Sequence, residues 1–599
     1  MSEQESQSPE QKDLARGLPM FSASDPEALT AEKAKLSAVQ NKGMLTRWKT
    51  YFSLTGPGWL QSAMTLGAGS AVASLFLGAY YQYRLLWIQP LAMVLGIIML
   101  SAMSYQTLTT GVRPFDAMRK FIHPAMAWAW ALAALAATVI WHFPQYGLAA
   151  GMLEDMIKAA TNWEPTGVKQ TILLLAIGTV FLIVSTKITW NYEAGHKGIR
   201  IYEKALKGMV WMIVVAFGTV VVYTTVQGKI AWSQVCKGFL PLYVPTDSMG
   251  IKTITGAFSA AVGINMTFLF PYTLLARGWS KEHRGLSRFD LISGMLVPYC
   301  LATLLMVIAT GGTIYHTLEN LKVHDIKDLP ALAKQVTAEG DLPSPSPSRR
   351  LWQMLDQDAQ VLLQKVALAN EATDEQKQVV CKALNTVITK PDFYTKEDFA
   401  GIQAELPTNT KDILKKDRSK WIDKEIRIVN RQSLDTAFPD NIKTLSFRVP
   451  PTKAAGMFEA VGISPIVSRY IFGLGILGIV LSSITLQMLM AGFGACEIFK
   501  WEPGGRAYKL ACLIPAPAML GVVLWKYMGT WIAVPTSAIC GVMLPIAYIG
   551  FFLLNNNKKY LGDATPRGGK AFIWNLGMLI AIAASVGSAS YYIYSHFIK

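Results

Sequence analysis

The chain opens with a polar stretch and then alternates between long apolar runs and short polar connections. Eleven runs approach or exceed the ~20 residues that a helix needs to cross the hydrocarbon core of a bilayer. They lie at about 54–80, 84–106, 124–150, 168–186, 202–224, 252–276, 289–316, 465–495, 507–526, 530–554 and 571–596. Runs of this length exceed the strands of membrane barrels, so we expect an all-α, polytopic membrane protein of about eleven transmembrane helices.

Composition and charge support this reading. Of the 599 residues, 52% are hydrophobic and only 16% are charged, and the mean hydropathy is +0.30. Soluble domains carry roughly 25% charged residues, so the deficit points to lipid. The net charge of +16 need not indicate a nucleic-acid partner, because Lys and Arg concentrate in alternate short loops, as cytoplasmic loops do. We therefore expect an integral protein of the plasma or bacterial inner membrane, with the N-terminus inside and the C-terminus outside.

The polar segments divide the chain into regions. Residues 1–53 lack the apolar core of a signal peptide and predict a mostly disordered cytoplasmic tail, with one short helix near 25–40. Residues 54–316 would hold spans one to seven, and residues 465–599 spans eight to eleven. The charged segment 317–464 lies between them and, by the parity of the spans, outside the cytoplasm.

This outer segment has helical character. One helix is expected at about 350–369, a second from Thr373, whose hydroxyl can cap the first turn, and a third from Thr395. The six cysteines form no metal-binding spacing. Cys236 and Cys381 both fall outside by this topology, and whether they pair is left open.

Two of the spans are interrupted near their centres. Span one contains Gly67-Ala68-Gly69-Ser70, and span six contains Gly263-Ile264-Asn265-Met266-Thr267 followed by Pro271. Each Gly weakens a helix by ~1 kcal/mol relative to Ala, and Pro removes a backbone hydrogen bond. Breaks five helices apart, in corresponding places, are typical of secondary transporters that bind solute between inverted repeats. The alternative is that these glycines only allow close helix packing.

An ordered set of motifs then resembles one known family. Gly56-Pro57-Gly58-Trp59-Leu60 opens span one, and Tyr202-Glu203-Lys204-Ala205-Leu206 opens span five. Later motifs are Phe472-Gly473-Leu474-Gly475 through Ser482-Ser483-Ile484-Thr485 to Glu497, then Leu544-Pro545 and Asn557 to Gly562. With residues 317–455 set aside, this set is similar to that of the natural resistance-associated macrophage protein (NRAMP) transporters of divalent metals. The resemblance implies a LeuT-like inverted repeat of five plus five helices, broken in helices 1 and 6. It also implies transport of Mn, Fe or Mg. No nucleophile, base and acid converge in the sequence, so we expect no enzymatic activity, and we expect no cofactor.

The ligands that the resemblance implies are largely replaced. The family's Asp-Pro-Gly-Asn run in helix 1 falls on Gly67 to Ser70, and its Met-Pro-His run in helix 6 on Thr267 to Leu269, with Met266 adjacent. Its acidic third-helix stretch falls on His142 to Tyr146, and its tenth-helix Gln on Ser537. No Asp or Glu lies near the middle of any predicted span. We therefore assign no metal ligand, although Met266 could serve as the soft ligand after a one-residue shift of the alignment.

The candidate binding set combines side chains near the two breaks with one from span ten. These substrate-binding candidates are Thr65, Gly67, Ser70, Asn265, Met266, Thr267 and Ser537. Neutral groups, with an outer half-helix beginning at Gly69, favour a neutral or anionic solute or a hydrated cation, whereas the resemblance implies a metal. A third alternative is a membrane receptor or scaffold that does not transport. The sequence does not specify the oligomeric state.

His142 is the one ionisable residue well inside a span. An ionisable group there is a functional hypothesis by default, and we take His142 as the candidate for proton coupling. The competing interpretation is a neutral histidine that is hydrogen-bonded to a neighbouring carbonyl.

Overall fold

The computed structural model describes residues 26–161, 167–191, 214–241, 248–313, 347–369, 373–388, 464–501, 505–528 and 532–594, with a few isolated positions between them. Helices make up nearly all of this part of the chain. The all-α fold class is therefore confirmed. The expected helix from Thr395 lies outside the described residues.

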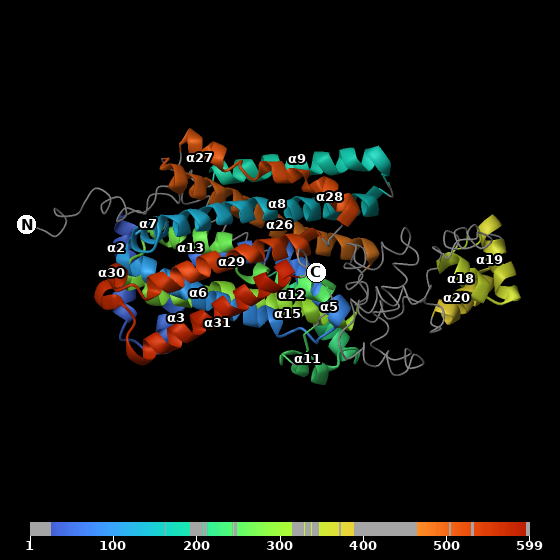
Figure 1. Ribbon diagram of the computed structural model, residues 1–599, viewed down its shortest axis with the longest axis horizontal. Coiled ribbons are helices and arrows are strands. Elements are labelled where there is room, and N and C mark those ends of the chain that lie inside the picture. Colours follow the sequence, from blue (N-terminus) through green and yellow to red (C-terminus); the bar gives the residue numbers. More distant parts are fainter. Residues whose placement is uncertain are drawn as a thin grey trace, which may run out of the picture.

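The apolar helices form one elongated bundle in which they run roughly along the same axis (Figure 1). In chain order they are α4 (Pro57–Thr65) with α5 (Ala68–Tyr81), α6 (Ile88–Thr110), α8 (Pro124–Thr161), α9 (Gly167–Asn191), α12 (Ser248–Ala261) with α13 (Ile264–Ala276), α14 (Arg284–Leu291) with α15 (Val297–Gly312), α26 (Pro465–Phe499), α27 (Arg506–Ala511) with α28 (Gly521–Met528), α29 (Ala533–Asn555) and α31 (Gly568–Ile593). Their apolar side chains build a single buried core.

Fewer full spans are described than the sequence predicts. Among the described residues nine helices are long and apolar enough to cross a bilayer, or ten if the bent pair of α4 and α5 counts as one span. The shortfall from eleven falls on the expected fifth span, 202–224. There the described part is a shorter apolar helix, Val214–Val226, and most of the remainder lies outside the described residues.

Two long helices support the middle of the bundle. Helix α8 has 38 residues and continues through Pro144, and α26 has 35 residues. The two pack against each other along much of their length. Helices α5 and α13 also contact both of them, and α4 contacts α26, so the broken spans are held against an unbroken pair.

The first 53 residues contain more helix than the sequence predicted. Helix α2 (Pro26–Val39) matches the expected short helix, but α3 (Met44–Leu54) follows where a disordered tail was expected. Helix α3 packs through Tyr51 on Phe289 of α14, with ring centroids 5.6 Å apart. The helix is short and has no side-chain cap, so this tertiary contact, which a local pattern does not reveal, accounts for it.

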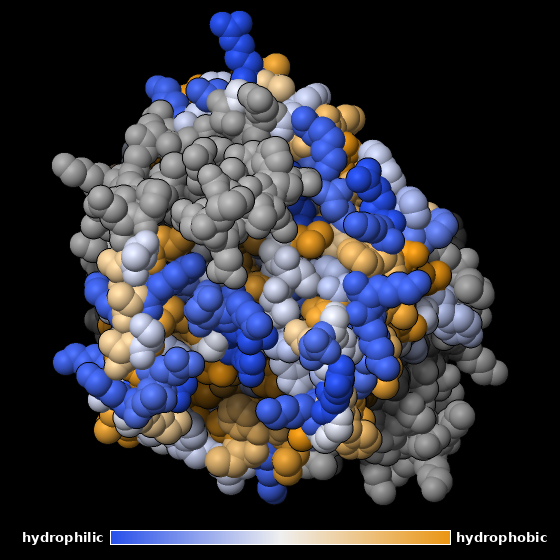
Figure 2. Space-filling view, turned by 90° about the vertical axis from the view of Figure 1, so that its left-hand side faces the viewer, coloured by the Kyte–Doolittle hydropathy of each residue, from blue (hydrophilic) through white to orange (hydrophobic). Residues whose placement is uncertain are grey.

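The two ends of the bundle differ. Helices α2, α3, α7 (Pro114–Phe121) and α30 (Lys558–Leu561) gather at one end, and α11 (Trp232–Gly238) lies at the other (Figure 1). Figure 2 views the first end face-on, and hydrophilic side chains cover much of the surface drawn in colour.

A group of three short helices lies beyond the end that carries α11 (Figure 1). The expected helix at 350–369 is two helices, α18 (Pro347–Met354) and α19 (Gln357–Ala369). Asp356 interrupts them because its carboxylate accepts a 2.7 Å hydrogen bond from the Ala359 amide and so caps α19. Helix α20 (Asp374–Ile388) begins after Thr373, whose hydroxyl accepts from the Gln376 amide, as expected.

The cysteine pair that the sequence left open is not formed. Cys236 is an exposed free thiol on α11, and Cys381 is a free thiol buried in the core of α18 to α20.

Candidate functional site

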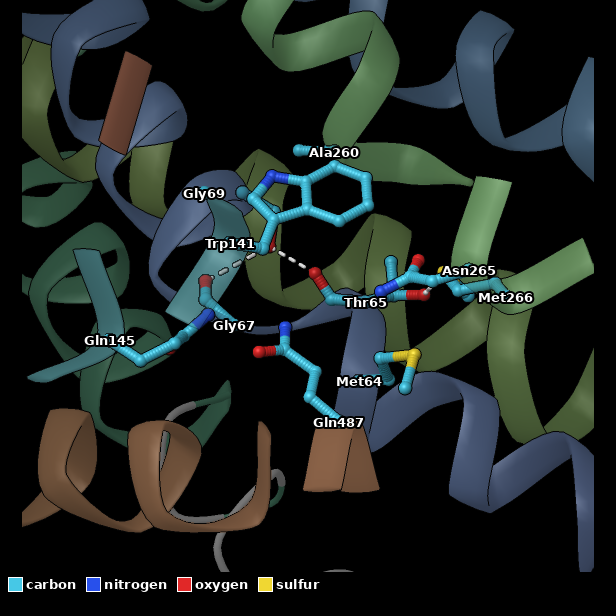
Figure 3. A pocket seen from close by; sticks show the side chains of 11 residues that line it. Met64, Thr65, Gly67, Gly69, Trp141, Gln145, Ala260, Asn265, Met266 and Gln487 are labelled. Carbon is cyan, nitrogen blue, oxygen red and sulfur yellow. Dashed lines mark hydrogen bonds between the residues drawn. The ribbon is translucent and has the colours of Figure 1, made fainter. Parts of the chain in front are cut away.

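Both helix breaks open onto the same cavity in the middle of the bundle (Figure 3). Helix α4 ends at Thr65 and α5 begins at Ala68 after a bend of 53°. Helix α12 ends at Ala261 and α13 begins at Ile264. Met64, Thr65, Gly67, Gly69, Ser70, Trp141, Gln145, Ala260, Asn265, Met266 and Gln487 line the cavity. The half-helix that follows the first break therefore begins at Ala68, one residue before the predicted Gly69.

The cavity is small. Its volume, taken as the space open to the centre of a water-sized sphere, is about 20 Å³. A polar cavity of this size holds about one water molecule. An ion or a compact polar group fits here without most of its hydration shell.

Gly67 is required at the first break because other side chains approach it closely. A Cβ atom there would lie 2.7 Å from Oγ of Ser483 and 2.8 Å from Nε2 of Gln145. Gln145 comes from α8, and its Oε1 accepts a 3.1 Å hydrogen bond from the Ala68 amide. Since Gly67 has no side chain to cap α5, Gln145 supplies that cap from a different helix.

Serine hydroxyl groups also bond to backbone carbonyls at this break. Ser70 donates to the carbonyl oxygens of Thr65, at 2.5 Å, and Gly67, at 3.3 Å. Ser483 of α26 donates to the Ala63 carbonyl at 3.2 Å. The bonds to Ala63 and Thr65 satisfy carbonyls in the last turn of α4, where intrahelical partners run out.

The thioether of Met266 lies at the junction of the two breaks. Its sulfur accepts from the Thr65 hydroxyl at 3.3 Å and faces the Gly263 amide at 3.5 Å. The structure thus brings the candidate soft ligand to the wall of the cavity, beside Thr65 and Asn265 (Figure 3).

Asn265 and Gln487 contribute polar atoms without protein partners. Asn265 is fully buried, and neither its amide nitrogen nor its amide oxygen has a hydrogen-bond partner among the described residues. The same holds for Oε1 of Gln487. A buried polar group without a partner costs ~1–3 kcal/mol, so these amides are suited to a ligand or a water molecule in the cavity.

Two predicted site residues lie behind the wall instead of lining it. Thr267 accepts a 3.0 Å hydrogen bond from the indole of Trp130. Ser537 accepts one of 3.1 Å from the indole of Trp141, and Trp141 itself lines the cavity. Ser537 therefore contacts the site through another side chain.

His142 is fully buried on α8 and is not among the residues that line the cavity. Its Nδ1 atom lies 3.1 Å from the Thr138 carbonyl, one helical turn earlier. Such a contact suits a neutral imidazole that donates to a carbonyl. Its role in proton coupling stays a prediction.

Sequence reasoning did not select several of the lining residues, namely Met64, Gly69, Trp141, Gln145, Ala260 and Gln487. Gln145 and Gln487 carried the one usable signal, because each is an amide inside a long apolar run. Trp141 and Ala260 carried none, since both residue types are common in membrane helices.

The cavity contains no ionisable side chain among its lining residues. In the part of the chain that the structure describes, no group of three or more His, Cys, Asp or Glu side chains could hold a metal ion. The cavity instead offers amides, hydroxyls and the thioethers of Met64 and Met266.

Comparison with known proteins places this arrangement in context. Residues 58–339 match the family model described as natural resistance-associated macrophage protein-like. A manganese transporter of Eremococcus coleocola, crystallised with an aromatic bis-isothiourea substituted compound, superposes with a TM-score of 0.53 at 12% identity, covering 92% of this chain and 88% of that one. Two mutant forms of that transporter give 0.51 and 0.52, with the same identity and coverage. No curated protein matches the sequence.

Proposed function

We propose that this chain is a member of the NRAMP family and a secondary transporter that carries a metal ion through the cavity between its two broken spans. The single observation that carries the proposal is that both breaks meet at one small polar cavity. Discontinuous helices that meet near the membrane midplane form the solute sites of such transporters.

The chemistry of the cavity suggests how a metal ion would be held. Met266 would offer a soft sulfur, and Asn265 and Gln487 would offer amide oxygens that have no protein partner. With no carboxylate among the lining residues, the charge of a divalent ion would be offset poorly, so we propose weak binding with some water retained.

Transport would require the broken spans to move relative to the long helices α8 and α26. Gln145 on α8 and Ser483 on α26 both bond to backbone atoms at the α4–α5 break. These two contacts join the parts that would rock against each other, so we propose that they change during alternating access.

We also propose the orientation in the membrane. The N-terminal helices α2 and α3 would face the cytoplasm, and α18 to α20 would lie outside. The arrangement supports this, because these two groups lie at opposite ends of the bundle (Figure 1).

The test is uptake by the full chain in proteoliposomes, with Mn²⁺ and Mg²⁺ as probes and a panel of small neutral and anionic solutes beside them. We expect Asn265→Leu to abolish uptake while thermal stability in detergent is unchanged, because neither atom of its amide bonds to the protein. The matched control is Thr267→Val, which lies behind the wall. It should cost ~1 kcal/mol of stability through the lost Trp130 hydrogen bond and leave uptake nearly intact.

Each outcome has a clear meaning. Uptake of a neutral or anionic solute without metal uptake would replace the metal in the proposal. Failure to take up any probe would favour the receptor or scaffold alternative. Normal metal uptake by Asn265→Leu would remove Asn265 from the site.

A further inference from the structure

Trp141 occupies a position that decides how much room the cavity has. Its side chain projects from α8 over the cavity, between the two breaks (Figure 3), and only 7% of the residue is exposed. It is the largest of the eleven lining residues. A change at this position alters the volume of the site more than a change at any other lining position.

Contacts on two sides fix the indole ring. On one side Nε1 donates to Oγ of Ser537 on α29 at 3.1 Å. On the other side the far edge of the ring lies against Gly263, where a Cβ atom would be 2.1 Å from two ring carbons. The ring is therefore wedged between α29 and the start of α13, and Gly263 has no side chain that could push it away.

We infer that Trp141 is a specificity-determining residue that sets the upper size limit of the solute. This inference rests on the proposed function and concerns the same site. With the indole in place the cavity measures about 20 Å³, so a metal ion must shed most of its water to enter. A metal complex whose six bound ligands do not exchange cannot shed them, so it would be excluded from the cavity.

The first experiment uses cobalt(III) hexaammine, an inert cation of about the size of a hexahydrated metal ion. Mn²⁺ uptake into proteoliposomes is measured with and without this competitor. We expect no more than a twofold inhibition of the wild-type protein, and at least a tenfold stronger inhibition of Trp141→Ala.

Trp130→Phe is the matched control, since Trp130 is a second buried tryptophan on α8 that does not line the cavity. It should behave as wild type toward the competitor. Ser537→Ala, which removes the anchor of the indole, should lie between wild type and Trp141→Ala. Equal inhibition of wild type and Trp141→Ala would overturn the inference.

A second measurement is independent of transport. Asn265→Cys, in a background without exposed thiols, is treated with a small and a bulky methanethiosulfonate reagent. We expect the ratio of bulky to small labelling rates to rise at least tenfold when Trp141→Ala is added, and to be unchanged by Trp130→Phe.

The two measurements separate the inference from the proposed function. A wild-type protein that takes up no Mn²⁺ but shows the labelling change would contradict metal transport and retain the size limit. An unchanged labelling ratio would overturn the size limit, whether or not Mn²⁺ is transported. Size-exclusion profiles and thermal stability of each variant identify any that do not fold.

Discussion

Trp279 donates a 3.0 Å hydrogen bond from its indole nitrogen to Oε1 of Glu32. This bond fastens helix α2 to the loop that follows α13. Arg277 lies over the Trp279 ring at 5.5 Å, and its guanidinium also contacts Gly56 at the start of α4. The N-terminal helix is thus joined through two side chains to α4, the first half of the first broken span.

This contact should depend on pH. Burial raises the pKa of Glu32 above its usual value, and the positive charge of Arg277 only partly opposes that effect. A carboxyl whose pKa is raised in the docked state favours docking at low pH, and that contribution is lost as the pH rises through the raised pKa. We therefore expect α2 to dock more firmly in acid than at neutral pH.

Pulsed electron paramagnetic resonance can measure this, with spin labels on exposed Ser37→Cys and Lys281→Cys. The distance distribution should broaden with rising pH in wild type. Glu32→Gln is neutral and keeps an acceptor oxygen, so its distribution should stay narrow at every pH. A distribution in wild type that does not change with pH would contradict the expectation.

Asp290 should be important for stability. Its carboxylate accepts from the Gly56 amide at 3.2 Å and from the Gly58 amide at 2.7 Å, and it is fully buried. Asp290→Ala leaves these buried amides without this acceptor and should destabilise the protein by ~2 kcal/mol, measured by thermal unfolding in detergent. Asp563→Ala removes only an exposed ion pair with Arg567 and should cost less than ~0.5 kcal/mol. Equal losses would show that the cap is unimportant.

Met266 should set the preference for soft metals. A thioether favours soft cations, so Met266→Leu, which keeps the volume and loses the sulfur, should reduce discrimination of Cd²⁺ over Mg²⁺. We expect a change of about fivefold in the ratio of their apparent affinities, equivalent to ~1 kcal/mol. Competition uptake measures this, with Met306→Leu as the matched control, because Met306 is a buried methionine on α15 that does not line the cavity. Wild-type binding of Mn²⁺ at low micromolar concentration, abolished by Met266→Ala, would show that the binding is stronger than we propose.

The proposed orientation predicts labelling from opposite sides. Pro345→Cys should react with a membrane-impermeant thiol reagent added outside intact cells, because the loop charges predict that residues 317–464 lie outside. Lys120→Cys, exposed at the opposite end on α7, should react only after the membrane is opened. The reverse pattern would invert the topology.

The fold was largely predictable because hydrophobic runs of spanning length and glycine at mid-span are local signals. The breaks at Gly67 and Gly263 were identified from such signals alone. What the sequence did not reveal depends on contacts between distant helices. Gln145 caps α5 from α8, and α3 forms against Phe289 of α14. No local pattern marks a partner that is 77 residues away, as Gln145 is from Ala68.

The candidate site was predicted in part for the same reason. Thr65, Gly67, Ser70, Asn265 and Met266 follow the breaks in sequence, and the structure brings them to one cavity. Thr267 and Ser537 were chosen by residue type and alignment. Neither signal reveals that the indole of Trp141 lies between Ser537 and the cavity.

The hydrogen bond between the Gly58 amide and Asp290 also has a consequence for biogenesis. The two residues are 232 positions apart, so at a synthesis rate of ~5–20 residues per second α4 is made roughly 10–50 s before the carboxylate that caps it. During that interval the Gly58 amide would have to be satisfied by water, lipid headgroups or the insertion machinery. Membrane integration of the first span should therefore be completed only after the seventh span has been synthesised. Until then the nascent chain depends on water, lipid headgroups or the insertion machinery to bond to the Gly58 amide.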